Sequence, residues 1–531
     1  MRVDLVYLPF SNSVYPDWKL GEIRMLPPHI PNAMVAIDSL IKNSTAGFTL
    51  IWNYKYGIPD QQLVMSLVEK PIDVWHAGLR LGLQGKPLFL QNIYPTWMYN
   101  YDTDPEIEST SFRLSMDACL FRNETWMKAG SGDGGFMTLQ MVGLDLGYRW
   151  IKSGAVIRYN PELITVPVEV KHDFNINEEF RFVRKNFPAK WFWWVLIRNI
   201  SRYGLRALGS AWKTRHIVQQ HHLLKGFTPA PSIAEMTEGS VSLLIPTLDR
   251  YEYLINELEQ LKNQTLRPFE ILITDQTKKE FRDSHFLKNY SDLNIRYFPQ
   301  DEQGQCYAWN KLLSEAKGEF VLFLGDDADG ITPDFIARLV SDCRYYNADM
   351  VASHVVEVGI EKSDDNDNNI RLADGFPICL VKRSLLLKTG FMDKVFNRDI
   401  RADHDLAMRC HKLGALMIYD KGCTILHHRA PSGGLRTHKA RVHTWSKSKS
   451  DLFLILLPTF SEFYLMRKYY NEAQVKEELA TRMFSLFFIH GAWAKRVFRL
   501  LVVIIKYPYI KYQMHKRNKW SKRKLKSINS L

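Results

Sequence analysis

The sequence predicts an α/β protein in which a mostly parallel central sheet is flanked by helices, with this fold present twice and followed by a basic helical tail. Three observations support this expectation. Short, continuously apolar segments alternate with helical segments in the second half, the pattern of a parallel sheet that is covered on both faces. A long ungapped match relates the first half to the second, and all the excess positive charge lies near the C-terminus. A chain of 531 residues that is 46% hydrophobic and 24% charged is long enough for several folded domains.

The second half shows the alternation most clearly. It opens with VSLLIP at residue 241, continues with a helical stretch around Tyr253 to Leu261, and then gives FEILIT, a second helix and FVLFL. Just before it, the segment from Lys225 to Ser240 is rich in Pro, Gly and Ser, which predicts a linker. Four regions are therefore expected, namely an α/β domain at 1–185, amphipathic helices and linker at 186–239, a second α/β domain at 240–440, and a basic helical region at 441–531.

The internal match is the evidence for a duplication. Laying Cys119 on Cys379, an offset of 260, superposes a series of identical residues without a gap. They are Leu120 on Leu380, Lys128 on Lys388, Gly130 on Gly390, Asp133 on Asp393, Phe136 on Phe396, Asp145 on Asp405, Leu146 on Leu406, Arg149 on Arg409, Lys152 on Lys412 and Gly154 on Gly414. A repeat of this length predicts two related units. A weaker, gapped match places Asn53, Tyr54 and Tyr56 opposite Asp326, Asp327 and Asp329.

An acidic cluster follows the apolar segment FVLFL. Asp326, Asp327 and Asp329 come immediately after it, at the carboxyl end of a predicted parallel strand, where ligands of such sheets bind. Clustered carboxylates repel one another, and Mg²⁺ or Mn²⁺ bound by one or two of them can also bridge the oxygens of a diphosphate. The alternative is an acidic turn, because Asp favours turns in any case.

A second acidic group lies in RADHDLAMRCHKLG, at a predicted helix start. Asp405 and Arg409 are four residues apart and can pair on one helical face. Asp403 lies near the helix N-terminus, where a carboxylate stays ionised, and an ionised carboxylate beside a hydroxyl suits a general base. The alternative for Asp403 is a plain helix cap.

The repeat separates these two acidic residues. The first half keeps the pair as Asp145 and Arg149, but Gly143 takes the place of Asp403. We therefore expect Asp405 and Arg409 to be structural, and Asp403 to act in chemistry together with the aspartate cluster, which is also missing from the first half.

Residues 241 to about 430 resemble the family 2 glycosyltransferases, which have a single nucleotide-sugar-binding α/β fold of the glycosyltransferase A type. VSLLIPTLDR resembles the family's opening strand and donor loop, FEILITDQT its second strand with the nucleotide-contacting aspartate, GQCYAWNKLLSEAKGEFVLFLGDDAD its helix and metal motif, and RADHDL its catalytic-base motif. These motifs cover most of the second half in the family's order. The first half resembles a partial, degenerate copy of the same fold.

The resemblance implies a metal-dependent inverting glycosyltransferase of polysaccharide biosynthesis that moves a sugar from a nucleotide-sugar donor to a glycan or lipid-linked acceptor. Asp403 would be the catalytic base, and Asp327, Asp329 and His427 would hold Mn²⁺ or Mg²⁺. The donor-binding residues would be Pro246, Thr247, Asp249, Arg250, Asp275, Asn310 and Asp326. His427 and His428 should point to opposite faces if their strand persists, so at most one of them is expected at the metal.

Two other functions stay open. The chain could be a non-catalytic glycan-binding scaffold, which would not turn over a nucleotide sugar. It could also be a two-site polysaccharide polymerase with both halves active, although the carboxylates missing from the first half argue against this.

The charge distribution predicts a membrane-surface partner. The net charge is +13, and after Glu478 there are 13 basic residues and no acidic one. This tail and the stretch from Lys190 to Lys213 interleave cations with bulky aromatic and aliphatic residues, a mixture typical of helices lying in an anionic lipid interface. A solvated basic face or a nucleic-acid patch is the alternative, but no nucleic-acid-binding module is found, so no nucleic acid is expected as a partner.

The remaining features concern localisation. No apolar run approaches the roughly 20 residues that span a bilayer, and the N-terminus, MRVDLVYLPF, lacks the pattern of a secretory signal. The six cysteines lack CxxC spacing, which favours reduced thiols. A cytoplasmic protein is therefore expected, peripheral on the cytosolic face of a membrane, and a homo-oligomer is an open alternative to a monomer.

Overall fold

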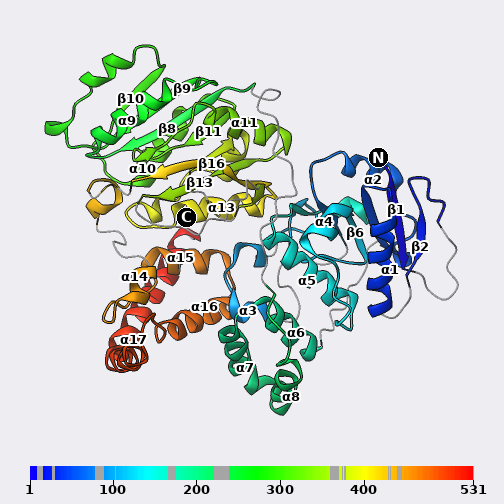
Figure 1. Cartoon of the computed structure of the whole chain (residues 1–531). Helices are drawn as coiled ribbons and strands as arrows, with labels where there is room; N and C mark the ends of the chain where they lie inside the picture. Colours follow the sequence, from blue (N-terminus) through cyan, green and yellow to red (C-terminus); the bar gives the residue numbers. More distant parts are fainter. Residues whose placement is uncertain are drawn as a thin grey trace.

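The computed structural model describes residues 1–8, 16–26, 30–77, 89–101, 103–164, 175–220, 238–358, 370–373, 375, 378–428, 430, 432–438 and 445–529. Most of the predicted linker, from Lys225 to Ser240, lies outside these residues. Two α/β units lie side by side, and helices that follow each unit in the sequence pack together beneath them (Figure 1).

The first unit is built on a seven-stranded mixed sheet. Its strands β1 and β3 are almost entirely buried, which explains why VDLVYL and FTLIWN carry apolar residues on both faces. The strands are β1 (Val3–Leu8), β2 (Ile23–Met25), β3 (Phe48–Asn53), β4 (Val74–His76), β5 (Ser109–Thr110), β6 (Ala118–Arg122) and β7 (Ile157–Tyr159), in the order β2-β1-β3-β6-β4-β7-β5. The helices are α1 (Ile30–Asn43), α2 (Gln61–Val68), α3 (Leu90–Ile93), α4 (Asn123–Ala129) and α5 (Leu139–Lys152).

The second unit is built on a nine-stranded sheet that contains every strand predicted above. The strands are β8 (Val241–Thr247), β9 (Glu270–Asp275), β10 (Ile295–Pro299), β11 (Phe320–Phe323), β12 (Ala328–Asp329), β13 (Met350–Glu357), β14 (Ile370–Leu372), β15 (Cys379–Lys382) and β16 (Met417–His427). Their order is β10-β9-β8-β11-β15-β13-β16-β12, with β14 paired to β16. The helices are α9 (Tyr251–Leu261), α10 (Gln305–Glu315), α11 (Phe335–Tyr345), α12 (Arg383–Thr389) and α13 (Ala402–Lys412).

The second sheet repeats the strand order and strand directions of the first. The path β1-β3-β6-β4-β7 has the pairings parallel, antiparallel, antiparallel and parallel, and the path β8-β11-β15-β13-β16 has the same four in the same sequence. The α/β class with flanking helices is thus confirmed. The expectation of a mostly parallel sheet is also confirmed, since most strands of each sheet run in one direction, although β6 and β15 run against both of their neighbours and both sheets are therefore mixed.

The backbone pairing also fixes how the two halves align. Strands β6 and β15 take the same place in the two sheets. Cys119 pairs with Ile51, and Cys379 pairs with Phe323, so aligning the two cysteines also aligns Ile51 with Phe323. Counting on from Ile51 and Phe323 places Lys55 opposite Asp327. This alignment differs by one residue from the gapped match expected from the sequence, and the compared residues lie just beyond the paired parts of β3 and β11.

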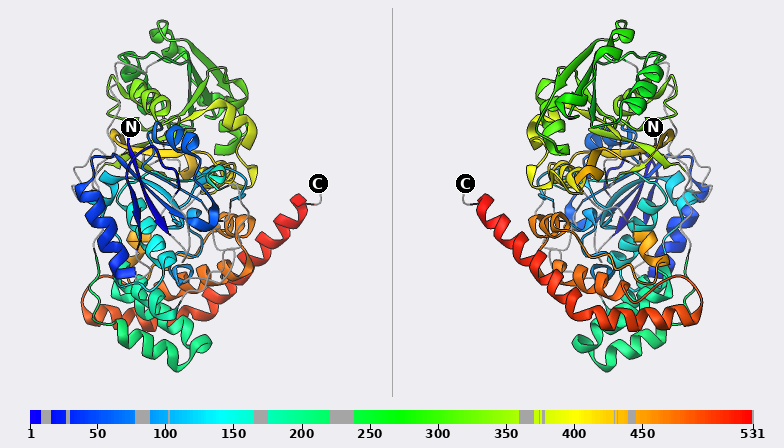
Figure 2. Two further views of the ribbon diagram at one scale, coloured as in Figure 1. Left: turned by 90° about the vertical axis from the view of Figure 1, so that its right-hand side faces the viewer. Right: turned by 90° about the vertical axis from the view of Figure 1, so that its left-hand side faces the viewer.

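The helices beneath the two units come from two distant parts of the chain. They are α6 (Ile176–Asn186), α7 (Ala189–Tyr203) and α8 (Leu205–Thr214) from the middle of the chain, and α14 (Trp445–Ser450), α15 (Phe460–Tyr469), α16 (Glu472–Ser485) and α17 (Trp493–Asn529) from its end. Trp194 of α7 stacks on Phe484 of α16 with ring centroids 4.3 Å apart. The 37-residue α17 crosses the lower end of the molecule (Figure 2) and packs against α15.

Several large apolar side chains of these helices face solvent. Trp193, Leu205 and Trp212 are 59%, 84% and 67% exposed, and Ile504 and Ile505 of α17 are 60% and 78% exposed. In the part of the chain that the structure describes, no helix is both long enough and apolar enough to cross a membrane.

Candidate active site

The candidate site lies where β8 and β11 end. These strands are parallel neighbours, so the residues that follow them meet at one edge of the sheet. The Thr247 hydroxyl donates to Asp326 Oδ2 at 2.9 Å, and Arg250 Nη1 lies 2.9 Å from Asp326 Oδ1 and 3.3 Å from Asp327 Oδ2. The guanidinium therefore balances the charge of both carboxylates.

Arg250 also ties this cluster to the loop after β16. Its Nε donates to the Ser432 carbonyl at 2.9 Å, and its Nη2 to the Gly433 carbonyl at 3.4 Å. Gly433 has a φ of 70°, and a Cβ there would lie 2.3 Å from the Leu248 carbonyl oxygen. Only glycine lets this loop pack so closely against the segment that follows β8.

The two neighbouring aspartates titrate differently. Burial raises the pKa of Asp326 to about 6, although the charge of Arg250 opposes the shift. Burial also acts on the pKa of Asp327, but the hydrogen bond and charge of His427 and the charge of Arg250 outweigh it and lower that pKa. Asp327 is therefore the more strongly ionised of the two and the better cation ligand.

Both histidines at the end of β16 reach the acidic cluster. His427 Nε2 lies 3.1 Å from Asp327 Oδ1, and His428 Nε2 lies 2.7 Å from Asp329 Oδ2. Both can do so because β16 ends at His427 and the face alternation of a strand does not extend to the next residue. They contact different carboxylates, and the expectation that at most one of them reaches the metal stays a prediction.

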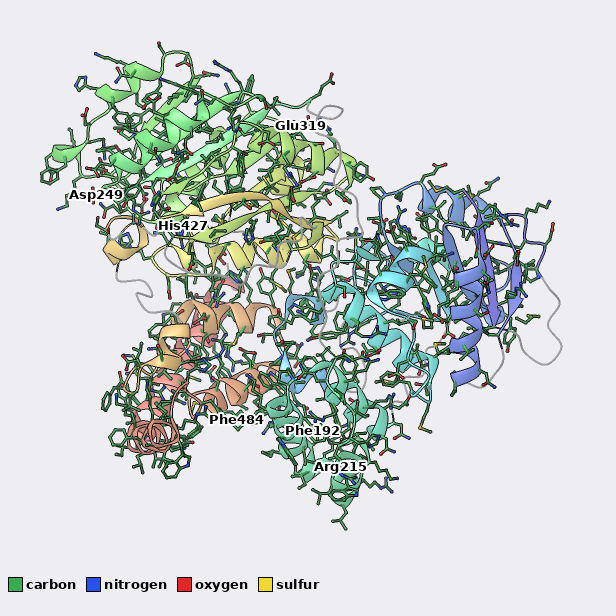
Figure 3. All side chains as sticks on the ribbon, in the orientation of Figure 1. Phe192, Arg215, Asp249, Glu319, His427 and Phe484 are labelled. Carbon is green, nitrogen blue, oxygen red and sulfur yellow. The ribbon has the colours of Figure 1, made fainter. Side chains whose placement is uncertain are left out.

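The predicted nucleoside-contacting aspartates, Asp249 and Asp275, lie beside this cluster, where β8 and the neighbouring parallel strand β9 end. Asp275 ends β9 and is fully buried, where its Oδ2 accepts hydrogen bonds from the hydroxyls of Tyr251 and Tyr297, each at 2.6 Å. Asp249 is exposed and has a φ of 56°, and its backbone N donates to the Thr277 hydroxyl at 3.0 Å. Asp249 and His427 lie on the same side of the second unit (Figure 3).

Asp403 lies in the first turn of α13. Burial raises the pKa of Cys379, and the charges of Cys410 and then Asp403 add to this shift, so Asp403 acts electrostatically on Cys379. Cys379 pairs with Phe323, the last residue of β11. The Asp403 side chain is 42% exposed, with Oδ1 at 3.0 Å from His404 Nδ1. Desolvation raises the pKa of Asp403, but hydrogen bonds and charge from His404 and the charge of Arg401 outweigh this effect and lower the pKa overall. Asp403 is therefore an ionised and partly exposed carboxylate.

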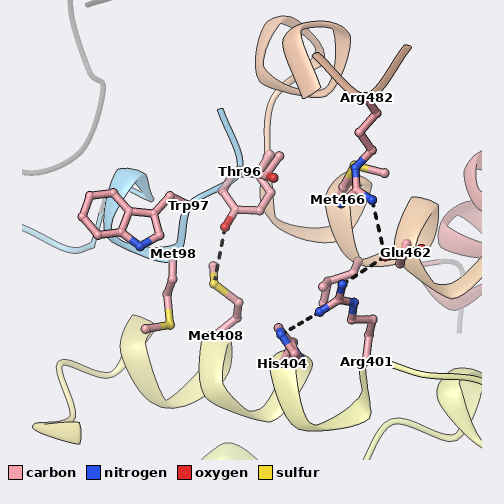
Figure 4. A pocket seen from close by; sticks show the side chains of 11 residues that line it. Thr96, Trp97, Met98, Arg401, His404, Met408, Glu462, Met466 and Arg482 are labelled. Carbon is pink, nitrogen blue, oxygen red and sulfur yellow. Dashed lines mark hydrogen bonds and ion pairs between the residues drawn. The ribbon is translucent and has the colours of Figure 1, made fainter. Parts of the chain in front are cut away.

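The start of α13 is held from the other side by the C-terminal helices. Arg401, with a φ of 87°, donates to Glu462 Oε1 at 3.0 Å and lies 2.7 Å from His404 Nε2. Glu462 caps α15 in a capping box with Thr459. These groups line a 220 Å³ cavity whose opposite wall is Trp97 of the first unit (Figure 4).

Comparison with known proteins agrees with this geometry. Residues 242–408 match the family "Glycosyl transferase family 2". This segment is a family 2 glycosyltransferase domain. It contains β8 to α12 and most of α13, and so includes both the aspartate cluster and Asp403.

Individual relatives are similar over shorter stretches. "Putative glycosyltransferase EpsH" of Bacillus subtilis (strain 168) is 30% identical over 107 residues, which is 20% of this chain and 30% of that protein. An "Uncharacterized glycosyltransferase" of Rickettsia bellii (strain RML369-C) is 26% identical over 92 residues, 17% of this chain and 13% of that protein. The chain thus spans less than a third of the length of these curated relatives.

Solved structures show low overall similarity. The "Mannosyltransferase PcManGT from Pyrobaculum calidifontis in complex with GDP-Man and Mn2+" is 15% identical with a TM-score of 0.35, covering 56% of this chain and 90% of that one. The "Crystal structure of S. aureus TarS 1-349 in complex with UDP-GlcNAc" is 16% identical with a TM-score of 0.35, covering 46% and 73%.

The side chains of the family 2 domain suit a divalent cation in part. Carboxylate and imidazole are ligands that Mn²⁺ accepts, and Asp327 and His427 offer one of each. Asp329, however, is occupied by His428, Asn256, Gln260 and its neighbouring backbone N–H. Within the described ranges, no three His, Cys, Asp or Glu side chains converge on one point. Two protein ligands still suffice for a cation that takes its other ligands from a diphosphate and water.

Two predicted donor residues have other contacts in the structure. Asn310 of α10 donates to the Met392 carbonyl at 2.9 Å and accepts from the Met392 N–H at 2.7 Å, which holds α10 against the segment after α12. Pro246 lies within β8 and is only partly buried. Neither residue contacts the acidic cluster through a hydrogen bond of the described chain, and both remain predictions as donor contacts.

Glu257 is a member of the site that the motifs did not reveal. It is fully buried in α9, and neither carboxylate oxygen has a hydrogen-bond partner within the described residues. Burial, followed by the charges of Asp326 and Asp327, raises the pKa of Glu257 well above its usual value. The helical spacing of Glu257 with Leu254, Leu258 and Leu261 is the signal that could have placed it on the buried face.

Proposed function

We propose that this chain is an inverting glycosyltransferase that moves a sugar from a nucleotide-sugar donor to a hydroxyl of a glycan or lipid-linked acceptor. The proposal rests on one observation. Thr247, Arg250, Asp326 and Asp327 meet at the carboxyl edge of the sheet of a family 2 domain. The half-exposed carboxylate of Asp403 acts electrostatically on Cys379, which pairs with the last residue of β11 just before this cluster.

In the proposed reaction the Asp403 carboxylate takes the proton of the acceptor hydroxyl. The acceptor oxygen then forms a bond to the anomeric carbon while the bond from that carbon to the diphosphate oxygen breaks, and the electron pair stays on the leaving diphosphate. A single displacement of this kind inverts the anomeric carbon. Arg250 orients the carboxylates and adds positive charge beside the leaving group, where developing negative charge needs it.

Metal dependence is part of the proposal. Asp327 and His427 would hold Mn²⁺ or Mg²⁺, and the cation would neutralise charge on the leaving diphosphate. Asp249 and Asp275 would face the nucleoside, with Asp275 held by Tyr251 and Tyr297 so that it keeps one orientation.

The first unit would serve as a scaffold. Gly143 occupies the position of Asp403, and a Cβ there would lie 2.3 Å from the Leu114 carbonyl oxygen, so no carboxylate side chain fits. Lys55 occupies the position of Asp327 and pairs with Asp117 at 3.2 Å. These two residues argue against a polymerase with two active units and favour a degenerate copy of the catalytic fold.

The decisive test is the Asp403→Asn variant, assayed for donor hydrolysis and sugar transfer across a panel of nucleotide sugars with Mn²⁺. Loss of a general base should lower kcat by about 10²- to 10⁴-fold, while the dissociation constant of the nucleotide diphosphate stays within a factor of about two. Wild-type protein that binds a nucleotide sugar and never turns it over would instead support the glycan-binding scaffold.

A membrane surface is the proposed location of the reaction. Helices α7 and α8 and the first part of α17 lie toward the lower end of the molecule (Figure 2). These helices carry exposed apolar side chains, and basic residues flank them in the sequence. This composition suits a helix lying in an anionic lipid interface on the cytosolic face of a membrane.

A further inference from the structure

A second cavity, of 550 Å³, lies between the family 2 domain and the last part of α17. One wall is the segment that leads into α13, including Arg398 and Asp399, and the other is the face of α17 with Lys516, Lys519 and Arg523. The α17 residues recur at positions i, i+3 and i+7, which places them on one side of the helix. Phe460 and Trp520 line the cavity as well, with ring centroids 5.3 Å apart.

The charge of this cavity is not balanced by the protein. Arg398, Lys516, Lys519 and Arg523 are all exposed, and none of them forms an ion pair with another described residue. The single carboxylate, Asp399, is already taken by backbone N–H groups, those of Ile400 at 2.9 Å and Ser461 at 3.4 Å. Four cations thus converge on a concave space without a partner, and an anionic ligand would supply one.

Neighbouring cations of the same tail are used differently. Lys522 pairs with Glu472 at 3.3 Å. Arg499 is buried and donates to the carbonyls of Leu452 and Leu486. The cations of α17 are therefore not all alike: some are held by carboxylates or carbonyls of the protein, whereas Lys516, Lys519 and Arg523 face the cavity without an ion pair to a described residue.

The position of the cavity points to the acceptor side of the reaction. Asp399 lies four residues before Asp403. Gln305 of α10 holds the backbone that leads to α13 by donating to the carbonyls of Phe396 and Asp399, at 3.2 Å and 2.5 Å. The donor diphosphate of the proposed function would lie instead beside Asp327, at the end of β11. The cavity adjoins the helix that carries the base and is built by different elements from the donor site.

We propose that this cavity binds a phosphate or diphosphate ester carried by the acceptor, so that the acceptor sugar reaches Asp403 while its anionic group rests among Arg398, Lys516, Lys519 and Arg523. The inference rests on the proposed function, since it assigns the acceptor of the same reaction. Such a group could belong to a polyprenyl-linked lipid or to a soluble phosphorylated glycan, and both present the same anion to the protein.

The test compares the full-length chain with K519Q/R523Q, and with K524Q/K526Q as a control that removes the same charge from exposed positions of the same helix. Inorganic pyrophosphate, titrated in EDTA so that no metal supports binding at the donor site, should bind the wild type and the control alike. Binding to K519Q/R523Q should be roughly 10- to 100-fold weaker, because two charge-assisted hydrogen bonds are lost. Equal pyrophosphate affinity in all three proteins, or no binding to any, would overturn the proposal.

A second arm distinguishes the source of the phosphate. Phosphatidylcholine vesicles with and without a polyprenyl diphosphate are tested for co-flotation. If the wild type floats more with the vesicles that contain polyprenyl diphosphate and K519Q/R523Q does not, the acceptor is lipid-linked. If K519Q/R523Q loses pyrophosphate binding but floats with both kinds of vesicle like the wild type, the acceptor is a soluble phosphorylated glycan. Donor hydrolysis without acceptor should stay at the wild-type rate in K519Q/R523Q. Absence of hydrolysis in the wild type would count against the proposed function while leaving the pyrophosphate result standing.

Discussion

At the scale of single residues, the environment of a carboxylate decides its role in this chain. Asp405 is fully buried and satisfied by Arg409, Lys468 and Tyr469, so it holds structure together. Asp403, two residues earlier, is 42% exposed with a lowered pKa, so it is ionised and accessible to solvent, as the proposed base must be. A helix start places both residues, but only their neighbours in space separate the two roles.

Glu179 gives a pH-dependent prediction away from the candidate site. It is buried, and burial raises its pKa to about 8, although the N–H of Phe89, which donates to it at 2.6 Å, and the charge of Arg202 both oppose the shift. In the unfolded chain the pKa returns to about 4.5. Between these two values only the folded state binds the proton, so the wild type loses stability as pH rises from about 4.5 to about 8.

The Glu179→Gln variant cannot ionise and still accepts the Phe89 N–H. Its stability relative to the wild type should therefore increase with pH across that window, by up to about 3 kcal/mol at pH 7. Calorimetric melting temperatures measured from pH 5 to pH 8 check this. A difference between variant and wild type that stays constant over this range would contradict the pKa assigned to Glu179.

At the scale of elements, the same ion cluster closes both units. In the first, Lys185 of α6 lies 3.0 Å from Asp133 and 2.7 Å from Asp145. In the second, Lys468 of α15 lies 2.8 Å from Asp393 and 2.7 Å from Asp405. Each lysine comes from a helix that follows its sheet. The repeat therefore extends beyond the strands to the helix that anchors each unit to the helical region.

Replacing Lys185 by Met tests the weight of this cluster. Lys185 is 4% exposed and Asp145 is fully buried, so the variant leaves a buried carboxylate with less compensation, which should destabilise the first unit by about 3–5 kcal/mol. Lys128→Met is the matched control, because Lys128 pairs with Glu124 on the surface and should change stability by less than about 1 kcal/mol. Calorimetry should show a lower temperature of the first unfolding transition for Lys185→Met, and no such change for Lys128→Met. Equal transition temperatures in both variants and the wild type would mean that the cluster does not stabilise the first unit.

The elements that the sequence predicted well are those set by local pattern. VSLLIP, FEILIT and FVLFL are continuously apolar, and each lies in a strand of the second sheet. Asp326 and Asp327 were expected at the sheet edge because they directly follow such a run. Contacts that depend on distant segments were not predictable in this way. The guanidinium of Arg250 meets residues 76 and 77 positions away, and the two tyrosines on Asp275 come from α9 and β10.

At the scale of the whole molecule, the C-terminal region is part of the folded body as well as the proposed membrane contact. Trp520 packs on Phe460, and Arg517 donates to the carbonyl of Pro458 at 2.5 Å. Deleting the residues after 480 would remove the side chains that pack on α15. A loss of membrane binding by such a truncated chain could then result from unfolding. Substitutions on the exposed face of α17 separate the two effects.

The double variant Ile504→Gln with Ile505→Gln makes the membrane proposal testable. These side chains are 60% and 78% exposed, so polar replacements should leave the melting temperature unchanged. If both insert into a lipid interface, each contributes roughly 1.5 kcal/mol or more, and their loss should weaken partitioning onto vesicles of phosphatidylcholine with phosphatidylglycerol by roughly 100-fold in a sedimentation assay. Ile58→Gln with Phe281→Gln, at positions 71% and 70% exposed on the two α/β units, is the matched control and should sediment like the wild type. Equal sedimentation of both double variants would mean that this face of α17 does not contact lipid, and that the charge of the tail serves the anion cavity instead.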